Sequence, residues 1–277
     1  MTGVAVVTGG ASGFGLAIAR SCAARDYAVA LLDIDGERAA AEAATVAQGG
    51  RAIGLAIDVA DPSAVERAAS AVRAQLGGAD LVFSNVGVQQ IGAFDGFSDE
   101  AWAWMLQVNV LGAARVARSF LPLLRDSDRP RLAFTASASV LVPASRLAAY
   151  QASKFAVLGL AETLRLELAA DGISVSVIFP SGMITRHLES SLAARPASVG
   201  GDIAPADDAE AMLASNPGFA RDVSSAEEAA RDVLDEVLAG EPYIVTHGDL
   251  LDGVLASQAL IRRAAERGRD RRSSAPR

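Results

Sequence analysis

Short apolar runs alternate with segments of helical apolar spacing along most of the chain. The runs are rich in valine, leucine, isoleucine and alanine, and they lie at residues 4–7, 28–32, 52–57, 80–84, 131–135, 173–179 and 243–246. Strands that are apolar along their whole length are expected where both faces of a sheet are covered, and intervening helices supply that cover. The 277 residues therefore predict one α/β domain, with a doubly wound parallel sheet of about seven strands and helices on both faces.

Helices are predicted between these runs, at residues 15–24, 37–48, 62–76, 98–124, 150–169, 225–239 and 250–261. Residues 181–224 break the alternation, with three prolines and only a short helical pattern at 206–214. A loop of this length inside a compact domain is expected to be a lid over a substrate site or a disordered insert. A C-terminal helix and an arginine-rich tail, solvated and mobile, are predicted for about residues 248–277.

A glycine-rich turn separates the first strand from the first helix. It reads Thr-Gly-Gly-Ala-Ser-Gly-Phe-Gly over residues 8–15. Glycines at such a turn let the backbone approach a pyrophosphate, which then binds the free N–H groups of the helix N-terminus. Asp33 ends the second strand twenty residues after Gly13, where its carboxylate can accept both ribose hydroxyls of adenosine and repel a 2′-phosphate. Neither Ser12 nor Ile34 supplies a cation for such a phosphate, so the sequence favours NAD over NADP; alternatively, Asp33 is an ordinary acidic residue at a strand end.

Tyr150 and Lys154 are four residues apart in a helical segment, which places a phenol and an ammonium on the same face. A free tyrosine has a pKa of ~10, and lowering it by ~3 units takes ~4 kcal/mol. The ammonium of Lys154 and the positive nicotinamide ring of NAD⁺ are candidate sources of that energy. The pair therefore indicates a tyrosine that exchanges protons near neutral pH, unless its spacing is a coincidence on a long helix.

Further motifs follow in a fixed order. They are Asp58-Val59, Ser84-Asn85-Val86-Gly87, Asn109, Ser137 thirteen residues before Tyr150, Pro180, and Thr185 five residues after Pro180. With the T-G-x-x-x-G-x-G turn and the Tyr-x-x-x-Lys pair, the chain from Val4 to about Thr246 resembles the short-chain dehydrogenase/reductase family. Two positions depart from the family pattern. Val86 replaces an alanine. Ser181 takes the place of the glycine in the usual Pro-Gly pair. This second change either alters the backbone that positions the nicotinamide ring or is a tolerated surface substitution.

The resemblance implies a Rossmann-type sheet that binds NAD and an enzyme that interconverts a secondary alcohol and its ketone. Tyr150 would be the general acid/base, Lys154 would bind the nicotinamide ribose, Ser137 would bind the substrate oxygen, and Asn109 would hold a water that relays protons from Lys154. Thr185 and the Met183 backbone would hold the carboxamide. The implied cofactor-binding residues are Gly9, Ser12, Phe14, Gly15, Asp33, Ile34, Asp58, Val59, Asn85, Val86, Gly87, Tyr150, Lys154, Pro180, Met183 and Thr185.

The substrate is predicted only by class. Beyond Ser137 and Tyr150, the candidate pocket residues are Gln89, Gln90, Ser139, Val140, Pro143, Met183, Ile184, His187 and Leu188. These side chains are mostly apolar, which suits a bulky, uncharged or aromatic alcohol. Alternatives are an epimerase, dehydratase or enoyl reductase of related fold, and an NAD-sensing regulator without catalysis.

Composition narrows the partners. The net charge of −8 disfavours a general nucleic-acid binder, since phosphate contacts need a basic face. The only cysteine, Cys22, is predicted to be a buried helix residue. No run reaches the ~20 apolar residues of a membrane span, and the N-terminus does not resemble a signal peptide, so a cytoplasmic protein is expected.

Two expectations concern assembly and metals. His187 and His247 lack the spacing of a metal pair, so no metal is expected, and His247 is predicted to be structural. A homotetramer or homodimer is expected from the resemblance, with apolar residues such as Phe155, Leu158 and Leu166 available for contacts; burial against the parent sheet would explain them equally well.

Overall fold

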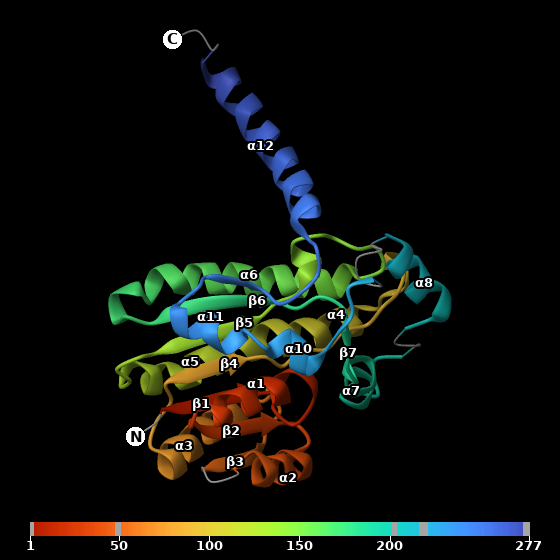
Figure 1. The fold of residues 1–277 in the computed structure, drawn as a ribbon. Helices are drawn as coiled ribbons and strands as arrows, with labels where there is room; N and C mark the ends of the chain where they lie inside the picture. The colour runs from red at the N-terminus through yellow and green to blue at the C-terminus, as the bar shows by residue number, and fades with distance from the viewer. Residues whose placement is uncertain (1–2, 48–50, 201–203, 216–220, 274–277) are drawn as a thin grey trace.

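The computed structural model describes residues 3–47, 51–200, 204–215 and 221–273. Seven parallel strands form its central sheet in the order β3-β2-β1-β4-β5-β6-β9 (Figure 1). These strands are β1 (Val4–Thr8), β2 (Ala28–Asp33), β3 (Ala52–Ala56), β4 (Leu81–Ser84), β5 (Arg131–Thr135), β6 (Ser174–Phe179) and β9 (Tyr243–Val245). The order reverses between β1 and β4, so the predicted doubly wound sheet of seven strands is confirmed.

Helices cover both faces of the sheet because successive strand residues face opposite sides. Val6 joins a core with α3 (Pro62–Leu76), α4 (Asp99–Leu106), α5 (Gly112–Arg125) and α6 (Ala148–Glu167). Its neighbours Ala5 and Val7 join the other core, with α1 (Gly13–Ala24), α10 (Ala226–Ala230) and α11 (Val233–Ala239). The last long helix before the lid region, α6, carries the Tyr-Lys pair and packs against β5 and β6.

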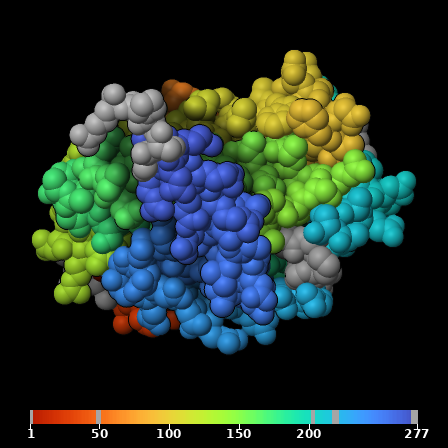
Figure 2. All heavy atoms as spheres, turned by 90° about the horizontal axis from the view of Figure 1, so that it is seen from above, coloured from red at the N-terminus to blue at the C-terminus, as the bar shows by residue number. Residues whose placement is uncertain are grey.

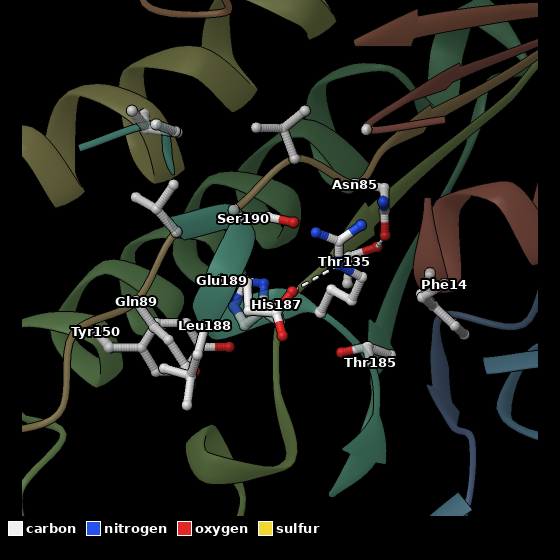
Figure 3. A pocket seen from close by; sticks show the side chains of 18 of the residues that line it. Phe14, Asn85, Gln89, Thr135, Tyr150, Thr185, His187, Leu188, Glu189 and Ser190 are labelled. Carbon is white, nitrogen blue, oxygen red and sulfur yellow. Dashed lines mark hydrogen bonds and ion pairs between the residues drawn. The ribbon is translucent and has the colours of Figure 1, made fainter. Parts of the chain in front are cut away.

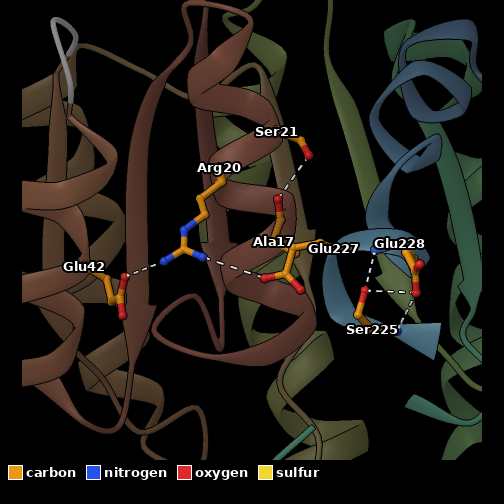
Figure 4. A network of polar contacts seen from close by, with 7 residues as sticks. All are labelled: Ala17, Arg20, Ser21, Glu42, Ser225, Glu227 and Glu228. Carbon is orange, nitrogen blue, oxygen red and sulfur yellow. Dashed lines mark hydrogen bonds and ion pairs between the residues drawn. The ribbon is translucent and has the colours of Figure 1, made fainter. Parts of the chain in front are cut away.

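Surface ion pairs connect the helices on the α1 face. Arg20 of α1 lies 3.1 Å from Glu42 of α2 (Gly36–Val46) and 3.7 Å from Glu227 of α10 (Figure 4). All three side chains are solvent-accessible, so each pair contributes little to stability. The same figure shows the Ser225–Glu228 capping box that starts α10, in which each side chain accepts from the other residue's backbone N–H.

Two predicted helices are interrupted. The segment 98–124 contains a π-helical turn, η2 (Gln107–Leu111), between α4 and α5. The segment 225–239 divides into α10 and α11. In the first case the interruption coincides with Asn109, whose side chain bonds to residues distant in the sequence, Val88 and Ser153.

The region predicted as a lid contains more regular structure than expected. Besides α8 (Ala206–Ser215), close to the predicted 206–214, it holds α7 (His187–Ala193) and a two-residue strand, β7 (Met183–Ile184). β7 pairs in parallel with β8 (Ser224–Ser225). Lid residues 201–203 and 216–220 and the predicted helix end Gln48 lie outside the described residues.

The C-terminal helix is longer than predicted. α12 (Leu251–Ser273) continues as a helix through the arginine-rich segment, and the mobility expected of that segment stays a prediction. Figure 1 shows α12 projecting from the body, and Figure 2, seen from above, shows the same helix foreshortened in front of the body. Among the helices of the described segments, none is long and apolar enough to cross a membrane.

Cys22 lies on the inner face of α1, with no exposed surface. Burial raises the pKa of its thiol to about 12. The prediction that it is a buried helix residue is confirmed.

Candidate active site

A cavity of about 1210 Å³ lies at the carboxyl ends of the strands. Ligand sites in proteins commonly measure roughly 300–1,000 Å³, so this cavity has room for a dinucleotide and a second molecule. Its lining runs from Asp33 and Asp58 at one end, past Tyr150, to Leu188 and Met212 at the other. The position matches the rule that open α/β sheets bind ligands where the strand order reverses.

The glycine turn is built for close approach. Gly9 and Gly13 have φ of +64° and +50°, a region that favours glycine. A Cβ on Gly15 would lie 2.1 Å from the Gly9 carbonyl oxygen, so no larger residue fits there without moving the turn. The first turn of α1 is thereby held against the end of β1, with its N-terminus open to the cavity.

Asp33 is tied to this turn. Its Oδ2 accepts from the N–H of Ala11 at 3.0 Å and its Oδ1 from the N–H of Asp35 at 3.2 Å. Ile34 lies beside it and is largely exposed. The lining here also includes Arg38 of α2, a cation that sequence reasoning missed because its distance along the chain gave no signal.

Hydrogen bonds connect the ends of β1, β4 and β5 to α6. The backbone N–H of Asn85 donates to Thr8 Oγ1 at 2.9 Å, and Asn85 Oδ1 accepts from Thr135 Oγ1 at 3.0 Å (Figure 3). The carbonyl of Thr135 in turn accepts from Lys154 Nζ at 2.9 Å. Gly87 makes room for this ammonium, since a Cβ there would lie 2.9 Å from Nζ. The Thr135 carbonyl was not among the predicted site groups.

Tyr150, Ser137 and Ser139 lie together in the cavity wall. The Ser137 oxygen accepts from both the N–H and the hydroxyl of Ser139, at 3.2 and 3.0 Å. Its own proton is therefore directed elsewhere, toward Tyr150 or a ligand oxygen. Burial raises the pKa of Tyr150 above its ordinary value, and the hydrogen bond to Ser137 lowers it in part.

Lys154 is buried, with 3% of its surface exposed. Desolvation lowers the pKa of its ammonium to about 8. Its Nζ lies 5.7 Å from the centre of the Tyr150 ring, so the two groups share one face of α6 as predicted. In the protein itself, burial opposes ionisation of Tyr150.

Asn109 lies beneath the cavity and does not line it. Its Oδ1 accepts from the N–H of Val88, and its Nδ2 donates to the Val88 carbonyl and to Ser153 Oγ, all within 2.9 Å. Both amide hydrogens are thus used inside the protein. The side chain fixes the strand-four loop against α6, and its predicted water-holding role stays a prediction.

Helix α7 forms a roof over Tyr150. The ring centroids of His187 and Tyr150 lie 6.4 Å apart, edge to face (Figure 3). Desolvation and the charge of Lys154 lower the pKa of His187 to about 4, so its imidazole is neutral at pH 7. The roof is held down by Ser191, a buried hydroxyl that accepts from the N–H of Gln89 at 3.1 Å.

The loop after β6 is fixed by two other segments of the chain. The Pro180 carbonyl accepts from the N–H of Ala138 at 2.8 Å. The Gly182 carbonyl accepts from the N–H of Ser224 at 3.1 Å and lies 2.8 Å from Nε2 of His247. Both ring nitrogens of His247 are engaged, as a structural histidine requires.

Most predicted cofactor and substrate residues line the one cavity. Those in the lining are Gly9, Ser12, Phe14, Gly15, Asp33, Ile34, Asp58, Val59, Asn85, Val86, Gly87, Gln89, Ser137, Ser139, Tyr150, Lys154, Pro180, Met183, Thr185, His187 and Leu188. Ile184, a predicted substrate residue, is 77% exposed and lies outside the lining, because it follows inward-facing Met183 in β7; its role stays a prediction. Gln90, Val140 and Pro143 also lie outside the lining.

Comparison with known proteins decides the family. The family model for short chain dehydrogenases matches residues 3–196. The chain belongs to this family. It is 36% identical to a 1-deoxy-11-beta-hydroxypentalenate dehydrogenase of Streptomyces exfoliatus, over 85% of this chain and 88% of that protein. It is 30% identical to a D-beta-hydroxybutyrate dehydrogenase of Cupriavidus necator, over 69% and 74% of the two chains.

A solved member of the short-chain dehydrogenase family supports the same conclusion. A Burkholderia phymatum short chain dehydrogenase/reductase in complex with NAD has a TM-score of 0.80 and 29% identity, covering 95% of this chain and 94% of that one. As a member of this family, the chain is an oxidoreductase that acts on hydroxyl groups with a nicotinamide cofactor.

Proposed function

We propose that the protein is an NAD-dependent dehydrogenase that interconverts a bulky, largely apolar secondary alcohol and its ketone. The observation that carries the proposal is the meeting of Ser137, Tyr150 and Lys154 in one cavity with the glycine turn and Asp33. The first group suits proton transfer at a substrate oxygen, and the second suits a dinucleotide.

The residues present fit the cofactor. A Cβ at Gly15 would fill the close contact between α1 and Gly9, which leaves backbone N–H groups at the helix N-terminus for a pyrophosphate. Asp33 would accept the adenosine ribose hydroxyls, and Thr185 with the Met183 backbone would hold the carboxamide. When bound, the nicotinamide exchanges hydride with the substrate carbon, and its positive charge favours ionisation of Tyr150.

Tyr150 would take the proton of the alcohol during oxidation and return it during reduction. Ser137 would donate to the substrate oxygen, because its own oxygen already accepts from Ser139 twice. Lys154, held by the Thr135 carbonyl, would bind the nicotinamide ribose and stabilise the phenolate. Asn109 would fix the loop and helix that carry these groups, and a water relay from Lys154 remains part of the proposal.

The far end of the cavity supports the substrate class. Its walls are largely apolar, with Leu147, Leu188, Pro196, Val199 and Met212 in the lining. The named polar groups near them, Gln89, Ser139 and the neutral His187, suit an uncharged substrate that has few hydrogen-bonding groups. The relative from Streptomyces exfoliatus, a dehydrogenase named for a hydroxylated pentalenate, favours the same class.

The proposal is tested with Tyr150→Phe. Wild-type protein is expected to produce NADH absorbance with NAD⁺ and members of a panel of bulky secondary alcohols. Tyr150→Phe is expected to lose at least about 10²-fold in kcat, since general acid–base groups contribute that much or more, while still binding NAD⁺. Ala148→Ser, on the same helix outside the cavity lining, is the matched control. Full activity in Tyr150→Phe would contradict the mechanism.

A further inference from the structure

We propose that His247 is a positioning residue for the nicotinamide end of the cofactor. By binding the Gly182 carbonyl, it fixes the loop between β6 and β7 in the orientation that receives the carboxamide. The inference rests on the proposed NAD-dependent function. His247 lies outside residues 3–196, the part of the chain that matches the family model.

The imidazole is held at both nitrogens. Nε2 lies 2.8 Å from the Gly182 oxygen, and Nδ1 lies 2.7 Å from Thr246 Oγ1. A carbonyl only accepts, so Nε2 carries a proton and donates it to the Gly182 oxygen. The Thr246 hydroxyl holds the other ring nitrogen and so restricts rotation of the imidazole away from Gly182.

The hydrogen bond to the Gly182 carbonyl also sets the direction of the Met183 N–H. No described peptide bond is cis, and in a planar trans peptide the N–H points opposite to the carbonyl. The Gly182 carbonyl and the Met183 N–H belong to one such peptide. Because the carbonyl points toward His247 and the Ser224 N–H, the Met183 N–H points away from both, toward the cavity that Gly182 and Met183 line.

The loop needs this hydrogen bond because its own residues restrict the backbone conformation only weakly. Gly182 has no side chain to restrict its backbone, and it follows Ser181, the residue that departs from the family pattern. Ser181 itself packs near the C-terminal segment: a Cβ on Gly248 would lie 3.4 Å from its hydroxyl. The segment 246–248 therefore contacts both Ser181 and Gly182, the two residues that restrict the loop conformation least.

The test compares two ligands that differ only at the nicotinamide end. NAD⁺ and ADP-ribose are titrated by calorimetry into wild-type protein, His247→Ala and His247→Gln. His247→Ala is expected to weaken NAD⁺ binding about tenfold, the effect of one lost hydrogen bond, and to leave ADP-ribose binding unchanged. His247→Gln is expected to retain most NAD⁺ affinity, because its amide can donate to Gly182 and accept from Thr246.

One further variant tests the same hydrogen-bonded chain, and another serves as a control. Thr246→Val removes the hydroxyl that anchors Nδ1 of the ring, and a selective loss of NAD⁺ affinity is expected there too. Asp249→Ala, a neighbour whose side chain makes no hydrogen bond in the described structure, should bind both ligands as wild type does. Unchanged NAD⁺ affinity in His247→Ala, or equal loss for both ligands, would overturn the inference. Failure of wild-type protein to bind NAD⁺ would instead contradict the proposed function and, with it, this inference.

Discussion

Among the charged side chains of the described residues, Lys154 is the most deeply buried. It is the only lysine in the chain, and the other 24 of the 25 basic residues are arginine. Guanidinium groups stay charged at all ordinary pH values, whereas a lysine can lose its proton when desolvated. The one position with a tunable ammonium is thus the one beside Tyr150, where burial lowers the pKa to about 8.

This pKa is directly measurable. In protein labelled with ¹³C-lysine, a single ε-methylene signal is expected, with a titration midpoint near pH 8 in place of the ordinary 10.5. Denatured protein serves as the control and should titrate at the ordinary value. A native midpoint above pH 10 would show that desolvation of Lys154 is not its dominant interaction.

The lowered pKa of Lys154 also determines whether stability rises or falls with pH. The folded pKa of Lys154 is below its unfolded value, so the unfolded chain binds more protons between about pH 8 and 10.5. Wild-type stability should therefore rise relative to Lys154→Met as pH increases through that window, by about 2 kcal/mol between pH 7.5 and 9.5. Urea unfolding at the two pH values checks the difference, since interactions that do not depend on pH cancel.

Asp33 is the residue on which cofactor choice is proposed to depend. Asp33→Ala is expected to weaken NAD⁺ binding about tenfold, through loss of the ribose acceptor. NADP⁺ binding should hold or improve, because Arg38 lies in the same lining and the opposing carboxylate is gone.

Fluorescence titration with both cofactors measures this preference. The double variant Asp33→Ala/Arg38→Ala is the control and should lose any gain in NADP⁺ affinity. Equal weakening of NAD⁺ and NADP⁺ in Asp33→Ala would remove Asp33 from its proposed role.

At the scale of helices and strands, the regular elements were predictable because each strand is apolar on both faces. The interruptions were not, since their causes lie in distant segments. The π turn at Gln107–Leu111 accompanies bonds from Asn109 to Val88 and Ser153, which local helical spacing does not reveal. β7 exists only because β8 lies beside it, forty residues away in the chain.

In the candidate site too, features set by local sequence were predictable and features set by distant segments were not. Tyr150, Lys154, Ser137 and the glycine turn were found because short motifs place them at strand ends or on one helix face. Ile184 lies outside the cavity lining, which the sequence did not indicate because the direction of this side chain depends on strand pairing. Arg38, which lines the cavity, and Ser191, which holds the Gln89 backbone, were missed because they lie on helices whose packing the sequence does not specify.

For the whole molecule, the outer face of α6 is the surface on which assembly is expected. Phe155 and Leu166 are 46% and 75% exposed on this helix, and burial against the parent sheet does not account for them. Members of the family are generally oligomeric, and we propose that this face forms a homo-oligomer interface.

Leu166→Glu is expected to lower the mass found by sedimentation equilibrium, because a buried unpaired charge at an interface is costly. Its NAD⁺ affinity should match wild type, since Leu166 is outside the cavity lining. Leu260→Glu on α12, also exposed, is the matched control and should leave the mass unchanged. A mass unaffected by Leu166→Glu would place the interface elsewhere.

The burial of Cys22 has a practical consequence for spectroscopy. It is the only thiol in the chain, it has no exposed surface, and its pKa is about 12. Reactivity requires the thiolate, so native protein should be nearly inert to thiol reagents. A cysteine introduced on α7 or α12 would then take a fluorophore or spin label selectively, and distances between the roof of the site and the body could be followed without first replacing the native residue.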